Sequence, residues 1–225
     1  MGGDPPDGAT AAHDDIRRHR DGRIRRRARV ERRTVVTDPG SRRGAVVFLT
    51  GLSGSGKSTI AEALAADLRA TGRAVTIVDG DVLRQQVSAD LGFDAASREA
   101  NVRRAAELAA RFATEGQIVI SALIAPFERA RVEAREIVEQ SAPFLLVYVS
   151  TPLDVAEARD PKGLYRRARA GEIPEFTGID SPYEAPIEPD LVIDTTQTAV
   201  SDAVSTIRAA LDEALEEAGQ ARDEA

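Results

Sequence analysis

A glycine-rich loop at residues 51–59 constrains the fold of this chain more than any other feature of the sequence. It reads Gly-Leu-Ser-Gly-Ser-Gly-Lys-Ser-Thr and fits the pattern G-x-x-x-x-G-K-S/T. An apolar, β-branched run at 45–50 predicts a buried strand before the loop, and the 3–4 spacing of apolar residues after it predicts a helix. A chance run of glycine and serine would lack these flanks. The arrangement therefore predicts a loop whose backbone N–H groups and helix N-terminus bind a nucleoside triphosphate.

Two lysines stand out as candidate functional residues. Lys57, in the loop, is expected to reach the β- and γ-phosphates and to be catalytic, and the Ser58 hydroxyl is expected to ligate Mg²⁺. Only two of the 30 basic residues are lysines, and Lys162 is the other, so it is either a second functional residue or a leftover surface lysine. The predicted ATP-binding residues of the loop are Gly51, Gly54, Ser55, Gly56, Lys57, Ser58 and Thr59.

The composition limits the chemistry that the chain can perform. It has no cysteine, and both histidines, His13 and His19, lie in the polar N-terminal segment. Disulfides, Cys-ligated zinc, thiol nucleophiles and a catalytic Ser–His pair in the core are therefore excluded. The remaining side chains, together with a bound metal ion, suit phosphoryl transfer, in which positioning and charge neutralisation do most of the catalysis.

From Gly44 onward, strand-like and helix-like segments alternate, as in a parallel sheet with helices on both faces. The predicted fold class is α/β, a P-loop NTPase-like three-layer αβα domain over 44–225 with a mostly parallel central sheet. Residues 159–187, which lack clear periodicity, are expected to form a mobile lid over a ligand. Strands are predicted at about 45–50, 74–79, 117–122, 144–149 and 191–194, and helices at about 57–71, 81–90, 98–115, 127–140, 153–158 and 197–218.

Residues 1–43 are predicted to form a separate N-terminal arm, disordered to about residue 15 and arginine-dense over 17–33. The arm is a solvated tail, binds an acidic helix of a partner subunit, or gates an anionic acceptor site. The net charge of −7 and the absence of a base-reading motif argue against a nucleic-acid partner. No apolar run approaches the ~20 residues of a membrane span and no secretory signal is recognised, so a cytoplasmic location without a membrane partner is expected.

Two carboxylates follow the second predicted strand, in the sequence Asp79-Gly80-Asp81. Ligands of open α/β sheets bind outside the carboxyl ends of the strands, so these carboxylates are expected beside the phosphate loop. They could hold Mg²⁺ through water and deprotonate an acceptor hydroxyl. Alternatively, an aspartate caps the following helix, and both hypotheses can hold together.

An aromatic ring and several guanidinium groups follow. They suggest an acceptor that is itself a nucleotide or an oxyanion. The alternative is a core phenylalanine with a solvated arginine face. The residues concerned are Arg84, Phe93, Arg98, Asn101, Arg103 and Arg104.

The chain resembles a known family over about residues 44–196, because three separated motifs of that family occur in it in the family's order. They are Asp79-Gly80-Asp81 continuing through Arg84 and Phe93 to Arg104, Asp160-Pro161-Lys162-Gly163-Leu164-Tyr165, and the run 176–186. The chain resembles adenylyl-sulfate kinases (APS kinases). The resemblance implies transfer of the ATP γ-phosphate to the 3′-hydroxyl of adenosine 5′-phosphosulfate (APS), giving PAPS, with Mg²⁺ as cofactor. It also implies a homodimer, and a sulfurylase is a candidate partner.

The same resemblance implies roles for individual residues. Asp81 contacts the acceptor ribose and is the candidate base, and Phe93 and Phe176 stack on the acceptor adenine. Lys162 reaches both nucleotides. The implied APS-binding residues are Asp79, Gly80, Asp81, Arg84, Phe93, Arg98, Asn101, Ile124, Lys162 and Phe176.

Several positions depart from the family pattern, and two alternative functions stay open. Ala125 replaces a serine that is phosphorylated in some members, Glu128 a common Arg, Ala130 a common Asp and Gln85 a usual His. One alternative is a P-loop kinase of a different small hydroxyl acceptor. The other is a non-catalytic regulatory subunit of a sulfate-activating complex, which the intact Lys57 argues against.

Overall fold

The computed structural model describes residues 43–223, with side chains described to residue 220. Most of the predicted N-terminal arm lies outside the described residues. A five-stranded sheet in the order β2-β3-β1-β4-β5 forms the centre, and each neighbouring pair of strands is parallel. The predicted α/β class is confirmed. The strands are β1 Ala45–Thr50, β2 Val75–Asp79, β3 Ile118–Ala122, β4 Phe144–Val149 and β5 Leu191–Ile193.

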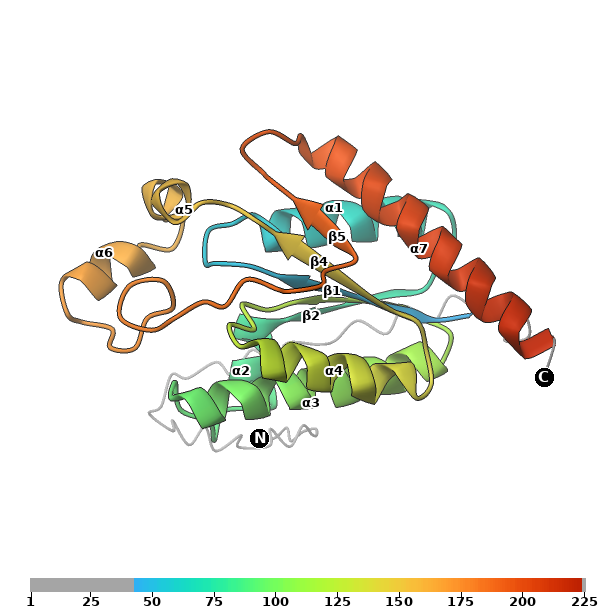
Figure 1. The fold of residues 1–225 in the computed structure, drawn as a ribbon, viewed down its shortest axis with the longest axis horizontal. Helices are drawn as coiled ribbons and strands as arrows, with labels where there is room; N and C mark the ends of the chain where they lie inside the picture. Colours follow the sequence, from blue (N-terminus) through green and yellow to red (C-terminus); the bar gives the residue numbers. More distant parts are fainter. Residues whose placement is uncertain (1–42, 224–225) are drawn as a thin grey trace, which may run out of the picture. The chain divides into compact units, whose positions relative to one another are not determined.

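Helices cover both faces of the sheet (Figure 1). Alternate residues of β1 point to opposite faces, and all six are buried. One face packs against α1 (Lys57–Ala70) and α7 (Val200–Asp223). The other face packs against α2 (Gly80–Gln86), α3 (Ala95–Thr114) and α4 (Glu128–Glu139). The inner strands β1, β3 and β4 are buried and read as mostly apolar runs, and the sequence predicts every strand of the sheet to within about one residue.

The helix boundaries differ more from the predictions, for local reasons. The predicted helix 81–90 begins at Gly80 and ends at Gln86. Helix α3 begins three residues earlier than predicted because the Asp94 carboxylate accepts a hydrogen bond from the Ser97 N–H at 3.0 Å and caps the first turn. In the described part of the chain, no helix is both long and apolar enough to cross a membrane.

The predicted lid segment contains a helix that the sequence pattern does not reveal. Helix α5 (Leu153–Arg159) leads into this segment, and α6 (Leu164–Arg169) lies within it. The Asp160 carboxylate accepts hydrogen bonds from the Tyr165 and Arg166 N–H groups, each at 3.1 Å, and so starts α6. A six-residue helix is too short to show a periodic apolar face. A small cluster of buried side chains, Ala156, Tyr165, Ala168 and Phe176, holds these helices together.

Candidate active site

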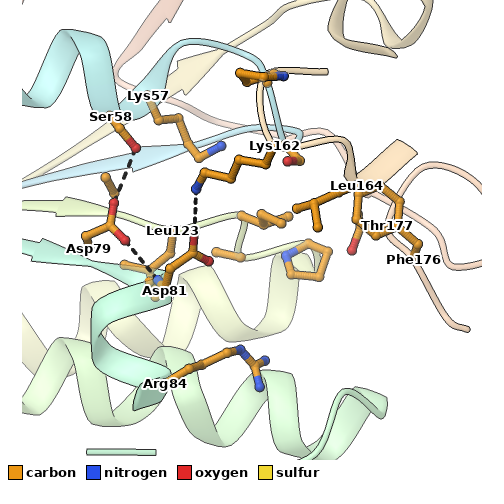
Figure 2. A pocket seen from close by; sticks show the side chains of 18 of the residues that line it. Lys57, Ser58, Asp79, Asp81, Arg84, Leu123, Lys162, Leu164, Phe176 and Thr177 are labelled. Carbon is orange, nitrogen blue, oxygen red and sulfur yellow. Dashed lines mark hydrogen bonds and ion pairs between the residues drawn. The ribbon is translucent and has the colours of Figure 1, made fainter. Parts of the chain in front are cut away.

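A cavity of about 1390 Å³ lies at the carboxyl ends of the strands. The glycine-rich loop, the start of α2, the loop after β3 and the lid segment line it (Figure 2). Pockets for one small ligand usually measure about 300–1,000 Å³. The cavity is thus large enough for more than one small ligand.

The glycine-rich loop curls tightly between β1 and α1. Gly54 has a φ of 74°, and a Cβ atom there would lie 2.8 Å from the Ala156 carbonyl oxygen, so only glycine fits. The Lys57 ammonium folds back over the loop, donating to the Gly51 carbonyl at 2.9 Å and the Leu52 carbonyl at 2.7 Å. Burial lowers the pKa of Lys57 to about 7, with a smaller contribution from the charge of Lys162.

Asp79 connects the glycine-rich loop to α2. One carboxylate oxygen accepts from the Asp81 N–H at 2.9 Å, so Asp79 caps α2 as one hypothesis expects. The other oxygen accepts from the Ser58 hydroxyl at 3.2 Å (Figure 2). A hydroxyl and a carboxylate side by side are oxygen ligands of the kind that Mg²⁺ takes alongside phosphate oxygens. Among the described residues, no group of three or more acidic, histidine or cysteine side chains is placed to hold a metal ion.

The Asp81 carboxylate forms an ion pair with the Lys162 ammonium, across the cavity from α2 to the lid segment (Figure 2). This hydrogen bond raises the pKa of Lys162. Both side chains are more than half exposed, at 56% for Lys162 and 63% for Asp81, so ligands can reach them. The candidate base and the second lysine thus face each other.

The arginine-rich side of the cavity is partly buried and partly open. Phe93 is 62% exposed, so the alternative of a core phenylalanine is wrong. The Arg84 guanidinium lies 4.6 Å from its ring centroid and donates to the Gly92 carbonyl at 2.7 Å. Arg98 is buried and donates to the Phe93 carbonyl at 2.5 Å. Asn101 is buried as well, and its Oδ1 atom has no hydrogen-bond partner.

Arg98 also connects this side to the lid segment. Its guanidinium donates to the Thr177 hydroxyl and to the Glu175 carbonyl. Phe176, between these two residues, is 8% exposed, and its ring packs edge-on against that of Tyr165 at 5.0 Å. Arg98 therefore supports the wall of the cavity in this structure, and a solvated arginine face does not describe it.

Comparison with known proteins identifies the family. The sequence profile described as adenylylsulphate kinase matches residues 43–194. The chain belongs to this family. The adenylyl-sulfate kinase of Paraburkholderia xenovorans is 52% identical over 169 residues, 75% of this chain and 93% of the relative. That of Geotalea uraniireducens is 48% identical over 170 residues, 76% of this chain and 81% of the relative.

Solved structures agree with this membership. The APS kinase of Mycobacterium tuberculosis, in complex with AMPPNP and APS, superposes with a TM-score of 0.74 at 41% identity, over 76% of this chain and 99% of that one. A hexameric APS kinase from Thiobacillus denitrificans gives a TM-score of 0.59 at 38% identity, over 76% of this chain and 29% of that one. The predicted P-loop NTPase-like fold is therefore confirmed at the level of the family.

Most site residues predicted from the sequence of this family member line one cavity. Gly51 and Ser55 are exceptions: they do not line it, and they shape the loop by accepting hydrogen bonds from Lys57. The predicted residues that line it are Gly54, Gly56, Lys57, Ser58, Thr59, Asp79, Gly80, Asp81, Arg84, Phe93, Arg98, Asn101, Ile124, Lys162 and Phe176.

The sequence reasoning missed a second group of residues on the loop side of the cavity. Arg159, Thr195 and Thr198 line it, and the Arg159 guanidinium donates to the Thr195 hydroxyl at 2.8 Å. The Thr195 hydroxyl also bonds to the Ser55 carbonyl at 3.1 Å, which connects this group to the glycine-rich loop. Polar residues directly after β5 were the available signal, because that strand ends at the same edge of the sheet.

The four departures from the family pattern lie in different places. Gln85 and Ala125 line the cavity. Ala130 is buried in the helical layer beneath the sheet. Glu128 lies outside the cavity lining and forms an ion pair with Arg131 in α4, so its carboxylate does not block the acceptor side.

Proposed function

We propose that this chain transfers the γ-phosphate of ATP to the 3′-hydroxyl of APS, forming ADP and PAPS. One observation carries the proposal: the glycine-rich loop and the arginine-rich side share one cavity, with Asp81 between them. The solved relative that binds AMPPNP and APS together supports the same pairing of ligands.

The loop side of the cavity is the proposed ATP site. Gly54 to Thr59 would hold the phosphates with backbone N–H groups at the start of α1, and Lys57 would turn from the loop carbonyls to the β- and γ-phosphates. Arg159 and Thr195 lie where the nucleoside would extend from the loop. Mg²⁺, held by Ser58 and phosphate oxygens, would neutralise charge on the transferred group.

The arginine-rich side is the proposed APS site. The exposed ring of Phe93 offers a stacking face for adenine, and Phe176 supplies the lid side. Arg84 adds positive charge beside Phe93 for the phosphosulfate. The unpartnered Oδ1 atom of Asn101 would accept a hydrogen bond from the ligand, because buried polar atoms are rarely left without a partner.

Asp81 and Lys162 are the proposed reacting-centre residues. The acceptor 3′-oxygen attacks the γ-phosphorus while the bond to the β–γ bridging oxygen breaks, and ADP leaves. The acceptor hydroxyl gives its proton to the Asp81 carboxylate. Lys162 would leave its ion pair with Asp81 and stabilise the negative charge that develops on the oxygens of the transferred phosphoryl group. The rest of the lid segment would exclude water.

An acceptor panel tests the proposal directly. ADP release from MgATP is measured with APS, with adenosine 5′-phosphate, with other small alcohols and with water alone. Turnover with APS far above the others is expected. Asp81→Asn should lower kcat about 10²–10⁴-fold. Asp90→Asn is the matched control, because Asp90 pairs with Arg104 outside the cavity lining. An APS rate no higher than that with water would refute the assignment.

Self-association is a second part of the proposal. A relative from Thiobacillus denitrificans is hexameric, and the family resemblance points to a dimer for this chain. We propose a homodimer, and light scattering of the purified chain measures its mass. A sulfurylase partner stays a prediction, which co-purification with that enzyme tests. A monomer at micromolar concentration would contradict the dimer.

A further inference from the structure

The loop that follows β3, residues 123–126, has an unusual backbone. It lines the cavity, and Leu123 lies beside Asp81 in Figure 2. Ala125 has a φ of 43°, in the left-handed region that residues with a Cβ atom rarely adopt. Such a conformation persists only where the surrounding structure holds it. The contacts of this loop therefore show what shapes that part of the cavity.

Two side chains outside the loop hold its carbonyl groups. The Thr50 hydroxyl, at the end of β1, donates to the Ile124 carbonyl at 2.7 Å. The Arg131 guanidinium, in α4, donates to the Ala125 carbonyl at 2.6 Å. Both bonds act on the residues at the left-handed turn, so the turn is fixed from two elements of the domain.

Arg131 is itself held rigidly. Its side chain is fully buried, and its charge is balanced by Glu128, whose carboxylate accepts from the Nε atom at 3.1 Å and from Nη2. The same Nη2 atom donates to the Glu184 carbonyl at 2.7 Å. Because a buried charge is tolerated only when it is paired and hydrogen-bonded, each of these contacts fixes the guanidinium plane.

The network also reaches Tyr183 and Glu184, near the end of the lid segment. The Glu184 N–H donates to the Pro126 carbonyl at 2.8 Å, and its carboxylate accepts from the Glu128 N–H at 2.7 Å. Tyr183 shares a hydrogen bond with the Thr50 hydroxyl at 3.0 Å. The loop, the start of α4 and the end of the lid segment are thus joined around one buried arginine.

We propose that Arg131 is a positioning residue for the acceptor: it holds residues 123–126 in the shape that receives APS, without lining the cavity itself. The assignment of the ligand rests on the proposed function. Glu128 and Glu184 are the partners that make this position rigid. Glu128, one of the departures from the family pattern, therefore supports the acceptor site indirectly, through its ion pair with Arg131.

The first test is Arg131→Lys, which keeps the charge but loses the planar fork that reaches several acceptors at once. The KM for APS is expected to rise about tenfold, the effect of losing one hydrogen bond to a charged group, while the KM for ATP stays within about twofold. Arg135→Lys is the matched control. Arg135 lies one turn further along α4 and pairs with Glu139 and Asp190, away from the cavity lining.

The second test uses glycine, which adopts the left-handed conformation without a steric cost. Ala125→Gly alone is the reference for the double variant, and its two KM values are measured first because Ala125 lines the cavity. In the Arg131→Lys background it should recover about threefold or more of the lost APS affinity, because the turn no longer depends on the arginine. Because glycine also relieves the strain of this turn, the recovery should appear in the KM for APS and not in the KM for ATP.

Hydrogen exchange separates this inference from the proposed function. Arg131→Lys should speed amide exchange at Ile124 and Ala125, and Arg135→Lys should not. If the wild-type protein failed to use APS, the proposed function would fail, and the exchange rates would still judge the positioning role. Equal rises in both KM values, no rescue by glycine, or unchanged exchange in the loop would each overturn the inference.

Discussion

Removing the Lys162 side chain separates its role in catalysis from its role in stability. Its ion pair with Asp81 lies on the surface, with the two side chains 56% and 63% exposed. Such a pair contributes at most about 1 kcal/mol to folding. For a domain of this size that corresponds to about 2–4 °C in Tm. Lys162→Ala should therefore fold almost as well as the wild-type protein.

The expected effect on turnover is far larger. If Lys162 follows charge onto the transferred phosphoryl group, its loss should lower kcat about 10²–10³-fold, as the loss of a charge-stabilising donor does in other enzymes. This corresponds to about 2.7–4 kcal/mol of transition-state stabilisation, well above the folding contribution. The comparison between the two magnitudes decides whether the lysine is functional or a leftover surface residue.

The assay is ADP release at saturating ATP and APS, with Tm measured on the same samples. Arg169→Ala is the control, because Arg169 lies in the same segment, is also 56% exposed and forms an ion pair with Glu157 outside the cavity lining. The control should keep wild-type turnover. A kcat for Lys162→Ala within about threefold of the control would refute the reasoning, because a transition-state contact cannot be so small.

Three further predictions follow from burial and charge. Burial lowers the pKa of Lys57 to about 7, so above that pH the ligand-free protein must gain a proton to bind ATP. ATP affinity, measured by calorimetry, should therefore fall from pH 7 to 9. A flat profile would mean that the ammonium stays charged in the loop. The hydrogen bond from Arg104 lowers the pKa of Asp90 to about 2. The stability that this pairing contributes is present above the usual pKa of 3.8 and is lost as the pH falls towards 2. In Arg104→Gln, the pKa of the Asp90 carboxyl, measured by NMR titration, should move back towards 3.8. Phe93→Ala should raise the KM for APS and leave the free energy of unfolding nearly unchanged, since the ring is 62% exposed. Phe176→Ala, at a buried ring, should lower the free energy of unfolding by about 3–5 kcal/mol. Equal losses of stability in the two variants would contradict this assignment.

Local patterns in the sequence predicted the sheet and the phosphate loop. The inner strands β1, β3 and β4 were predictable because strands covered on both faces are mostly apolar, and the outer strands β2 and β5 from short apolar runs. The start of α3 was missed because a cap at Asp94, not apolar periodicity, begins it. Helix α6 was missed because its six residues are too few to show an apolar pattern, and because the Asp160 carboxylate, not apolar periodicity, starts it.

The candidate site divides in the same way. Asp79 and Asp81 were predictable from the rule that parallel strands end at one edge, and the arginine-rich run from its composition. The burial of Arg98 was not, because its partners Glu175 and Thr177 lie nearly 80 residues away in the chain. The position of Glu128 outside the cavity lining was not predictable either, because its ion pair with the buried Arg131 forms only in the folded structure.

By itself, the sequence determined that this chain binds a nucleotide on a parallel sheet, because a phosphate loop and a buried strand are defined by neighbouring residues. The tertiary structure decided which charges meet. Lys162 reaches Asp81, and Arg131 supports the Ala125 turn, only because distant segments pack together at the carboxyl edge of the sheet. Hydrogen bonds and ion pairs act over a few ångströms of space, whatever the separation along the chain.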